Sequence, residues 1–292
     1  MTDIRQNFIC IGAQKAGTTT LADIISRHPD IYIPPIKETK YFLFDEDYQK
    51  GKIFYDSYFK SLGNQKAVGE VDPDYLLFPI TAQRIADTLG KNIRLIVILR
   101  NPADRAYSHY LMTKKKGLEP FEFEKALEEE KNRKHTVREQ KIFAYLERGY
   151  YGKQISEFLK VFPKENFLFL TFEDDLIKNK AQTIENVQKF LNVAIMPLDL
   201  NVHSNEAGEA VNEKLRDLVR RPNFTKRLLK GLLPSKEFRK AIRKFFIRKN
   251  LQKAAAPKID EATKKRIIET YFKSDIQFTE SITGLNLEKW YN

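Results

Sequence analysis

The sequence predicts an α/β fold of three layers, in which a central parallel sheet is flanked by helices. Two observations support this prediction. Short apolar runs alternate with segments of helical periodicity, which is typical of βαβ units. One run, Ile93 to Leu99, is aliphatic at almost every position, as strands are when a parallel sheet buries both of their faces.

The first βαβ unit begins near the N-terminus. Asn7 to Ile11 is a short apolar run, and a glycine-containing loop follows it. In the segment from Thr18 to His28 apolar residues recur at helical spacing. We therefore expect a strand, a loop and a helix in that order.

The second unit is built around the aliphatic run. The chain continues from this run into Arg100, Asn101 and Pro102. Asn101 suits the N-cap of a helix, Pro102 suits its first position, and Asp104 suits the positive end of the helix dipole. A helix is therefore predicted from Pro102.

A third strand is expected at Asn166 to Thr171. It follows a predicted helix in which Ile155, Phe158, Leu159 and Phe162 fall on one face.

Two further segments lie between these units. Ala67 to Val71 is predicted as another short strand, and Phe123 to Arg148 as a charged, mostly helical excursion. Because ligands of such sheets bind beyond the carboxyl ends of the strands, the loops after the first strand and after the aliphatic strand are the expected site.

Length and composition predict one soluble domain over residues 1–292. The hydrophobic content of 42% and the charged content of 31% are ordinary for a globular protein. No apolar run is long enough to cross a membrane, and the first residues lack the apolar region of a secretory signal. The single cysteine, Cys10, lies in an apolar run and is predicted to be inert packing. We expect a cytoplasmic location.

Positive charge is concentrated in one segment, predicted as a basic helical insertion or lid at about 212–258. Sixteen Lys and Arg residues and only two acids lie between Lys214 and Lys258, whereas the whole chain has a net charge of +12. Nucleic acid is therefore not an expected partner of the chain as a whole. The segment could be a core-packed helix with a solvated basic face, a lid over an acidic substrate or nucleotide, or a peripheral contact with an anionic membrane.

The first loop resembles a phosphate-binding loop with a displaced lysine. Gly12 and Gly17 have the spacing of the pattern G-x-x-x-x-G-K-[ST], but Thr18 occupies the position of the lysine, and Lys15 lies inside the loop. Glycine backbone and a helix that opens with three threonines can direct N–H and O–H groups at an anion. The alternative is a simple strand-to-helix turn with a solvated lysine.

Arg100 and Ser108 form a second candidate pair. A guanidinium at a strand end and a hydroxyl two turns into the next helix could clamp a phosphate. Arg100 could equally cap the carbonyls of a neighbouring helix. Where a P-loop NTPase would carry a magnesium-holding aspartate, this strand ends in Arg100 instead.

Several stretches together resemble the sulfotransferases that use 3′-phosphoadenosine-5′-phosphosulfate (PAPS). Among these, the carbohydrate branch of heparan sulfate N- and O-sulfotransferases is most similar, and particularly the heparan sulfate N-sulfotransferase domain. The resemblance runs in order to about Leu191 and resumes faintly in ITGLNLEKW near the end. The stretches are IGAQKAGTTT (11–20), HPDIYIPPIKETKYF (28–42), RNPADRAYSHY (100–110) and RGYYGKQISEFLKVFP (148–163).

The resemblance implies a P-loop-like fold and roles for particular residues. Arg100 and Ser108 correspond to the pair that holds the 3′-phosphate. Glu38 corresponds to the general base, although by itself an acid between Lys37 and Lys40 would be taken for a surface ion pair; we expect burial to oppose the effect of the two lysines on its pKa. His109 is a reserve candidate for the base. The 5′-phosphosulfate would be held by Gly12, Gln14, Lys15, Ala16, Gly17, Thr18, Thr19 and Thr20.

The acceptor contacts depart from the family pattern. After Glu70 the carbohydrate branch usually has a lysine and then a serine or threonine, but this chain has Val71 and Asp72. Glu70 and Asp72 could contact an amine or a polyhydroxyl acceptor, or Glu70 could merely support the loop. Tyr150 and Tyr151 are also expected at the acceptor.

The resemblance implies transfer of the sulfuryl group from PAPS to a hydroxyl or amine, with PAP as product and no metal. Lys15 would stabilise charge on the bridging oxygen, and Glu38 would take the acceptor's proton. The acceptor is expected to be a glycan or a small molecule. Two alternatives are a P-loop kinase or NTPase and a basic protein that binds membrane surfaces.

Overall fold

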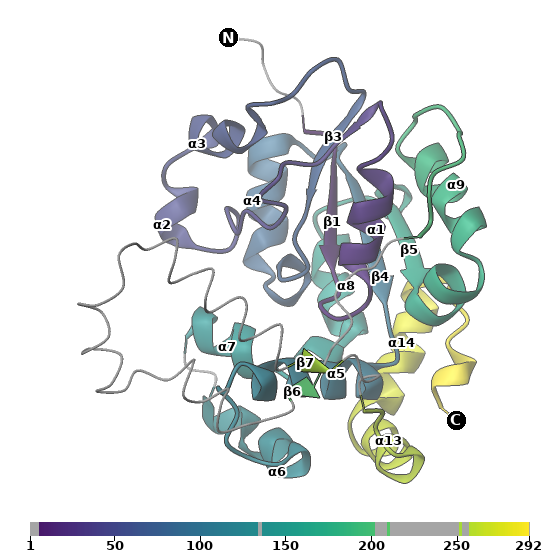
Figure 1. The fold of residues 1–292 in the computed structure, drawn as a ribbon. Coiled ribbons are helices and arrows are strands. Elements are labelled where there is room, and N and C mark those ends of the chain that lie inside the picture. Colours follow the sequence, from purple (N-terminus) through teal and green to yellow (C-terminus); the bar gives the residue numbers. More distant parts are fainter. Residues whose placement is uncertain (1–5, 134–135, 202–208, 211–250, 253–256, 292) are drawn as a thin grey trace.

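The computed structural model describes residues 6–133, 136–201, 209–210, 251–252 and 257–291. Its centre is a five-stranded parallel sheet with the strand order β2-β3-β1-β4-β5 (Figure 1). The predicted α/β fold with a parallel sheet is therefore confirmed. The strands are β1 (Phe8–Gly12), β2 (Ile31–Tyr32), β3 (Ala67–Val71), β4 (Arg94–Leu99) and β5 (Phe167–Thr171).

Helices cover both faces of the sheet (Figure 1). From β1 the chain passes to β2 at one edge of the sheet and then to β3, which lies between β2 and β1. It next crosses over β1 to reach β4 on the other side. Since parallel crossovers are right-handed, this reversal places α1 and α4 on opposite faces. The connecting and flanking helices are α1 (Thr18–Ile25), α4 (Ile80–Leu89), α8 (Tyr151–Leu159) and α9 (Lys180–Phe190).

Shorter helices surround this framework. Between β2 and β3 lie α2 (Asp45–Tyr48) and α3 (Lys52–Asp56), and the connection from β4 to β5 contains α5 (Pro102–Lys115), α6 (Phe123–Glu128) and α7 (Val137–Phe143). Near the C-terminus α13 (Glu261–Ile267) and α14 (Lys273–Thr283) follow. Two π-helical segments span Phe172–Lys178 and Ile268–Phe272. Single 3₁₀ turns lie at Ser57–Phe59, Tyr75–Leu77, Glu129–Arg133, Glu147–Gly149, Lys164–Asn166 and Glu288–Trp290.

The core is centred on β1 and β4, which pair with each other along the middle of the sheet. All five residues of β1 and the last five of β4 are buried. Gly69 of β3 packs so closely against β1 that an added Cβ would lie 2.0 Å from the Phe8 carbonyl oxygen. The aliphatic run was therefore correctly predicted as a strand buried on both faces.

The start of α5 confirms the predicted cap. The Asn101 side chain accepts hydrogen bonds from the backbone N–H groups of Ala103 and Asp104, at 3.1 Å and 3.2 Å. Pro102 occupies the first helical position, where its missing N–H costs no hydrogen bond. This cap fixes the direction in which the chain leaves β4.

The order of the strands predicts where a ligand would bind. The chain leaves β1 toward one side of the sheet and leaves β4 toward the other, so a ligand crevice is expected between the loops that follow these strands. In Figure 1 these ends lie at the lower edge of the sheet. The loop with Lys15 and the residue Arg100 both lie there.

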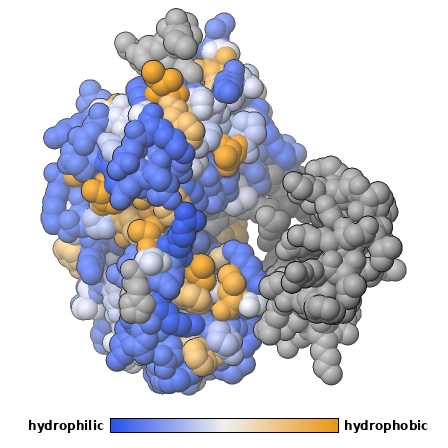
Figure 2. Space-filling view, turned by 90° about the vertical axis from the view of Figure 1, so that its left-hand side faces the viewer, coloured by the Kyte–Doolittle hydropathy of each residue, from blue (hydrophilic) through white to orange (hydrophobic). Residues whose placement is uncertain are grey.

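The predicted basic insertion at about 212–258 lies almost entirely outside the described residues. Within it, β7 (Leu251–Gln252) is described and pairs antiparallel with β6 (Glu209–Ala210), which precedes the segment. In the part of the chain that the structure describes, no helix has the length and apolar character needed to cross a membrane. The face in Figure 2 is largely hydrophilic, with groups of hydrophobic residues between the hydrophilic ones.

Candidate active site

The loop between β1 and α1 directs the start of a helix at the crevice. Gly17 is the N-cap of α1 and has the left-handed φ of 89° that glycine tolerates. Because glycine has no side chain, the N-cap residue offers no side-chain acceptor to the first N–H groups of α1. The helix begins with Thr18, Thr19 and Thr20. This arrangement can donate several hydrogen bonds to one anion.

Lys15 lies inside this loop with a half-buried side chain and a left-handed φ of 71°. Burial lowers the pKa of its ammonium, and the charges of Arg100, Lys116 and Arg105 lower it further. No carboxylate pairs with Lys15 among the residues that the structure describes. An anion bound here would relieve this excess of positive charge.

The structure brings the two predicted phosphate-binding elements together. The Arg100 Nη1 donates a hydrogen bond of 3.2 Å to the backbone oxygen of Lys15. The guanidinium also lies over the ring of Phe172, 4.8 Å from its centroid, and the Tyr151 hydroxyl donates to the Arg100 carbonyl at 2.9 Å. Arg100 is thus held against the first loop by contacts on several sides.

The remaining predicted donor-site residues differ in exposure. Ser108 lies on α5, the helix that follows Arg100, and is half-buried. Ala16 is part of the core, and Thr18 is only 4% exposed. The buried Oε1 of Gln14 has no hydrogen-bond partner among the described residues. A buried polar atom without a partner in this loop is consistent with a ligand site.

Glu38 lies in a tight turn between two lysines. Its carboxylate is 3.5 Å from the Lys37 ammonium and 3.1 Å from that of Lys40. The expected burial of Glu38 is not found, because 37% of its side chain is exposed. Lys37 in turn donates a hydrogen bond of 2.8 Å to the hydroxyl of Thr19. The turn is therefore linked directly to the first loop.

Glu70 is hydrogen-bonded to the turn that contains Glu38. Its carboxylate is fully buried and accepts hydrogen bonds from the backbone N–H of Thr39 at 3.2 Å, from Tyr55 at 3.0 Å and from Tyr75 at 3.1 Å. Burial, and secondarily the charge of Asp72, raises the pKa of Glu70 to about 8. These contacts agree with a supporting role, which was the alternative to contact with an acceptor.

Asp72 is also fully buried. It accepts hydrogen bonds from the ammonium and the backbone N–H of Lys40, at 2.6 Å and 3.0 Å, and from the N–H of Asp74 at 3.2 Å. Burial raises its pKa, although the charge of Lys40 opposes the effect. Asp72 contacts the turn around Glu38 and is not exposed to an acceptor in this structure.

Asp74 extends this network toward α8. Its carboxylate lies 2.7 Å from the Lys40 ammonium, 3.3 Å from that of Lys141 and 2.7 Å from the Arg148 guanidinium. Burial alone would raise its pKa, but Arg148, Lys40 and Lys141 outweigh burial and hold the pKa below the ordinary value. The charges around Glu38 thus form one connected set.

The two predicted tyrosines pack against the C-terminal helices. Tyr151 is fully buried, with its ring 6.0 Å from Trp290, and Tyr150 is half-buried with its ring 5.2 Å from Phe272. Among the described residues, Tyr151 contacts the site through its hydrogen bond to the Arg100 carbonyl. In the described residues no contact joins either tyrosine to Glu38.

His109 and Cys10, the two other residues considered for reactivity, are both buried. His109 is fully buried, both of its ring nitrogens lack a partner in the described part, and burial lowers its pKa well below the ordinary value. It is therefore inaccessible as a reserve base in this structure. Burial raises the pKa of Cys10 to about 12, in keeping with the predicted inert packing. The described residues contain no group of three His, Cys, Asp or Glu side chains that could hold a metal.

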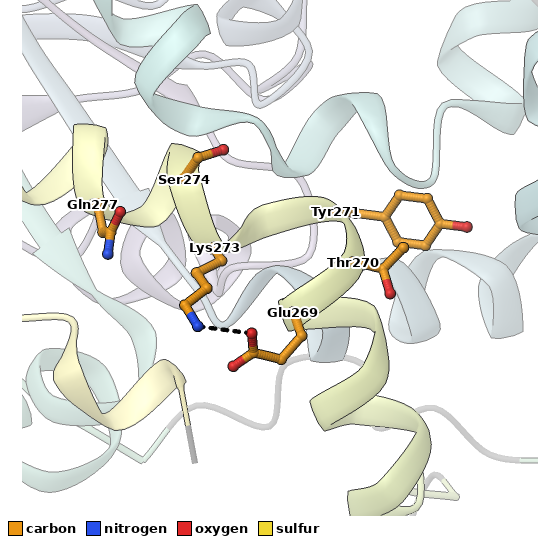
Figure 3. Close-up of a pocket in the computed structure, with 6 residues that line it drawn as sticks. All are labelled: Glu269, Thr270, Tyr271, Lys273, Ser274 and Gln277. Carbon is orange, nitrogen blue, oxygen red and sulfur yellow. Dashed lines mark hydrogen bonds and ion pairs between the residues drawn. The ribbon is translucent and has the colours of Figure 1, made fainter.

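A surface pocket of about 300 Å³ lies elsewhere, on α14 and the π-helical segment Ile268–Phe272 that precedes it (Figure 3). Lys273 and Glu269 form an ion pair of 2.8 Å at this pocket. None of the residues predicted for the donor or the acceptor lines it. The candidate site therefore remains the crevice at the sheet edge.

Sequence reasoning missed Lys37 and Lys40 as members of the site. They were treated as flanking charges, because their contacts with Thr19, Asp72 and Asp74 depend on the fold. Both have positive φ angles, 46° and 61°, which a lysine in the sequence does not predict. Their position on either side of Glu38 in KETKYF was the only available signal.

The chain matches a family model described as a sulfotransferase domain over residues 5–271. It is 24% identical to a crystal structure of a sulfotransferase from Alicyclobacillus acidocaldarius, which superposes with a TM-score of 0.68 over 99% of this chain and 100% of that one. That likeness supports the P-loop-like α/β fold.

Curated relatives are similar over parts of their length. The chain is 27% identical to heparan sulfate glucosamine 3-O-sulfotransferase 5 of Homo sapiens over 201 residues, which are 68% of this chain and 56% of that protein. It is 43% identical to the membrane-associated sulfotransferase kil1 of Dictyostelium discoideum over 107 residues, which are 36% of this chain and 22% of that protein. The chain thus spans about half of the former and under a quarter of the latter.

Proposed function

Because the chain belongs to the sulfotransferase domain family, we propose that it transfers the sulfuryl group of PAPS to a hydroxyl or amine of a carbohydrate acceptor. The observation that carries the proposal is the contact between Arg100 and the backbone of Lys15, which joins two anion-binding elements at one sheet edge. Similarity to heparan sulfate glucosamine 3-O-sulfotransferases supports a glycan as the acceptor.

The residues of the crevice fit PAPS. The uncapped start of α1 and the hydroxyls of Thr18 to Thr20 suit the 5′-phosphate, and Arg100 with Ser108 suits the 3′-phosphate. The half-buried Lys15 ammonium, with cations around it and no carboxylate partner among the described residues, suits a further negative charge. When bound, PAPS would supply a sulfuryl group on a phosphate leaving group.

In this proposal each side chain has a distinct task. Lys15 stabilises negative charge at the bridging oxygen, because it lies inside the loop assigned to the 5′-phosphosulfate. Glu38 accepts the proton of the acceptor, and its 37% exposed side chain leaves it accessible to one. Glu70 and Asp72 fix the backbone of the turn that presents Glu38. We propose that no metal takes part.

A P-loop kinase or NTPase is not favoured, since the family model is that of a sulfotransferase. The proposed peripheral contact of residues 214–258 with an anionic membrane and the cytoplasmic location stay predictions. The description of kil1 as membrane-associated applies to that relative and does not extend to this chain.

The experiment that tests the function supplies radiolabelled PAPS together with O-desulfated heparan sulfate, a phenol and a lipid panel, with EDTA present. We expect label on the glycan and release of PAP. Labelling of the phenol or lipid alone would overturn the carbohydrate assignment. Absence of both transfer and PAP binding, or magnesium-dependent turnover of ATP in a parallel assay, would overturn the sulfotransferase assignment.

A further inference from the structure

The two lysines beside Glu38 have different surroundings. The Lys40 ammonium lies 2.6 Å from Asp72 and 2.7 Å from Asp74, so two buried carboxylates already neutralise it. The Lys37 ammonium has no such pair. It donates to the Thr19 hydroxyl at 2.8 Å and lies 3.5 Å from Glu38. Lys37 is thus the cation between the donor loop and the base.

We propose that Lys37 is a catalytic residue, whose ammonium contacts the oxygens of the sulfuryl group as it passes from donor to acceptor. This inference rests on the proposed function. It adds a second cation to Lys15, on the side of the sulfuryl group that faces Glu38.

The location of Lys37 fits the distribution of charge in the reaction. In an in-line transfer negative charge is spread over the equatorial oxygens of the moving group. Thr19 belongs to the loop assigned to the 5′-phosphosulfate, and Glu38 is assigned to the acceptor. An ammonium bonded to the first and adjacent to the second is therefore beside the path between them.

The end of β3 contributes no cation of its own. The residue after Glu70 is Val71, which is fully buried, and the next residue, Asp72, is committed to Lys40. This strand end therefore offers no ammonium to the crevice. Lys37 supplies a positive charge from the connection between β2 and β3.

The backbone of the turn is shaped to present Lys37. Its φ of 46° is left-handed, a conformation that costs a long L side chain about 1 kcal/mol or more. The N–H of Lys37 is bonded to the Pro34 carbonyl at 2.8 Å, which helps to fix that conformation. Strained backbone of this kind is concentrated at functional sites.

A purely structural role makes a different prediction. If Lys37 served only to brace Thr19, its loss would weaken binding of PAP and turnover of PAPS to the same extent. If it contacts the sulfuryl group, turnover falls while PAP binding is retained, because PAP lacks that group.

The test compares Lys37→Met with the wild-type chain in two measurements. Calorimetric titration with PAP measures donor-site binding without any sulfuryl group, and labelled PAPS with O-desulfated heparan sulfate measures turnover. We expect unchanged PAP affinity and a loss in kcat of about 100-fold. Lys37→Arg should recover part of the loss, because it restores the charge.

Lys52→Met is the matched control. Lys52 is also partly buried and paired with a carboxylate, Asp56 at 2.8 Å, but it lies on α3. It should retain wild-type turnover. Equal losses of PAP affinity and turnover in Lys37→Met, or no loss of turnover, would overturn this inference alone. A wild-type chain that neither binds PAP nor transfers label would overturn the proposed function with it.

Discussion

Asp74 and Arg148 form a buried ion pair that ties the end of β3 to the turn before α8. The Arg148 Nη2 donates to the Asp74 Oδ1 at 2.7 Å, and their side chains are 4% and 2% exposed. Lys40 and Lys141 approach the same carboxylate. One acidic side chain thus forms ion pairs with three cations from different parts of the fold.

Asp74→Asn should destabilise the protein by about 3–5 kcal/mol, because it leaves the buried Arg148 without its counter-charge. Urea denaturation at neutral pH measures this loss. Asp199→Asn is the control, since Asp199 pairs with Arg27 on an exposed surface and should change stability by about 1 kcal/mol or less. Similar losses in the two variants would contradict the importance assigned to burial.

Glu70 should make stability depend on pH. Its folded-state pKa of about 8 lies above the ordinary 4.5, so between these values the unfolded chain has released a proton that the folded chain retains. Stability from this group is therefore lost as pH rises through the window, by up to about 1.4 kcal/mol per pH unit.

Glu70→Gln removes that titration, so the difference in stability between this variant and the wild-type chain should shift in favour of the variant as pH rises from 4.5 toward 8. Urea midpoints at several pH values provide the measurement. Parallel pH profiles of the two chains would show that Glu70 ionises normally in the folded state.

Lys15→Ala should lower kcat by about 100- to 1000-fold, since one preorganised donor to developing charge is lost. The melting temperature should change little, because the side chain is only half-buried and has no carboxylate partner in the described residues. Lys160→Ala, on an exposed ion pair with Glu157, serves as control. Full turnover of Lys15→Ala with labelled PAPS would remove Lys15 from the mechanism.

Glu38→Gln should lower kcat by about 100- to 10,000-fold and leave PAP affinity unchanged, because the amide cannot accept the acceptor's proton. Glu157→Gln is a control of matched exposure, 35% against 37%. Turnover and calorimetric titration with PAP distinguish the two effects. A variant with normal turnover would require another base.

The sheet was largely predictable because burial on both faces leaves a local signature. The aliphatic run that forms β4 and the Asn101-Pro102 cap of α5 are both encoded by adjacent residues. The two-residue strand β2 is too short for any periodicity, and Phe162 is buried beyond the end of α8 rather than within it. Such features depend on neighbours distant in sequence.

The site was predictable only in part for a related reason. The positions of Lys15 and Arg100 follow from strand ends, and the fold places them in contact. The burial of Glu70 and Asp72 follows instead from hydrogen bonds to Thr39 and Lys40, about thirty residues away. The sequence alone could not show that these acids face inward to the turn.

The sharing of the Lys40 ammonium by Asp72 and Asp74 has an evolutionary consequence. A neutral residue at position 40 would leave the buried Asp72 without its paired cation, whereas Asp74 would keep Arg148 and Lys141. A neutral residue at position 72 would take from Lys40 one of its two buried carboxylates. These positions should therefore change together among homologues.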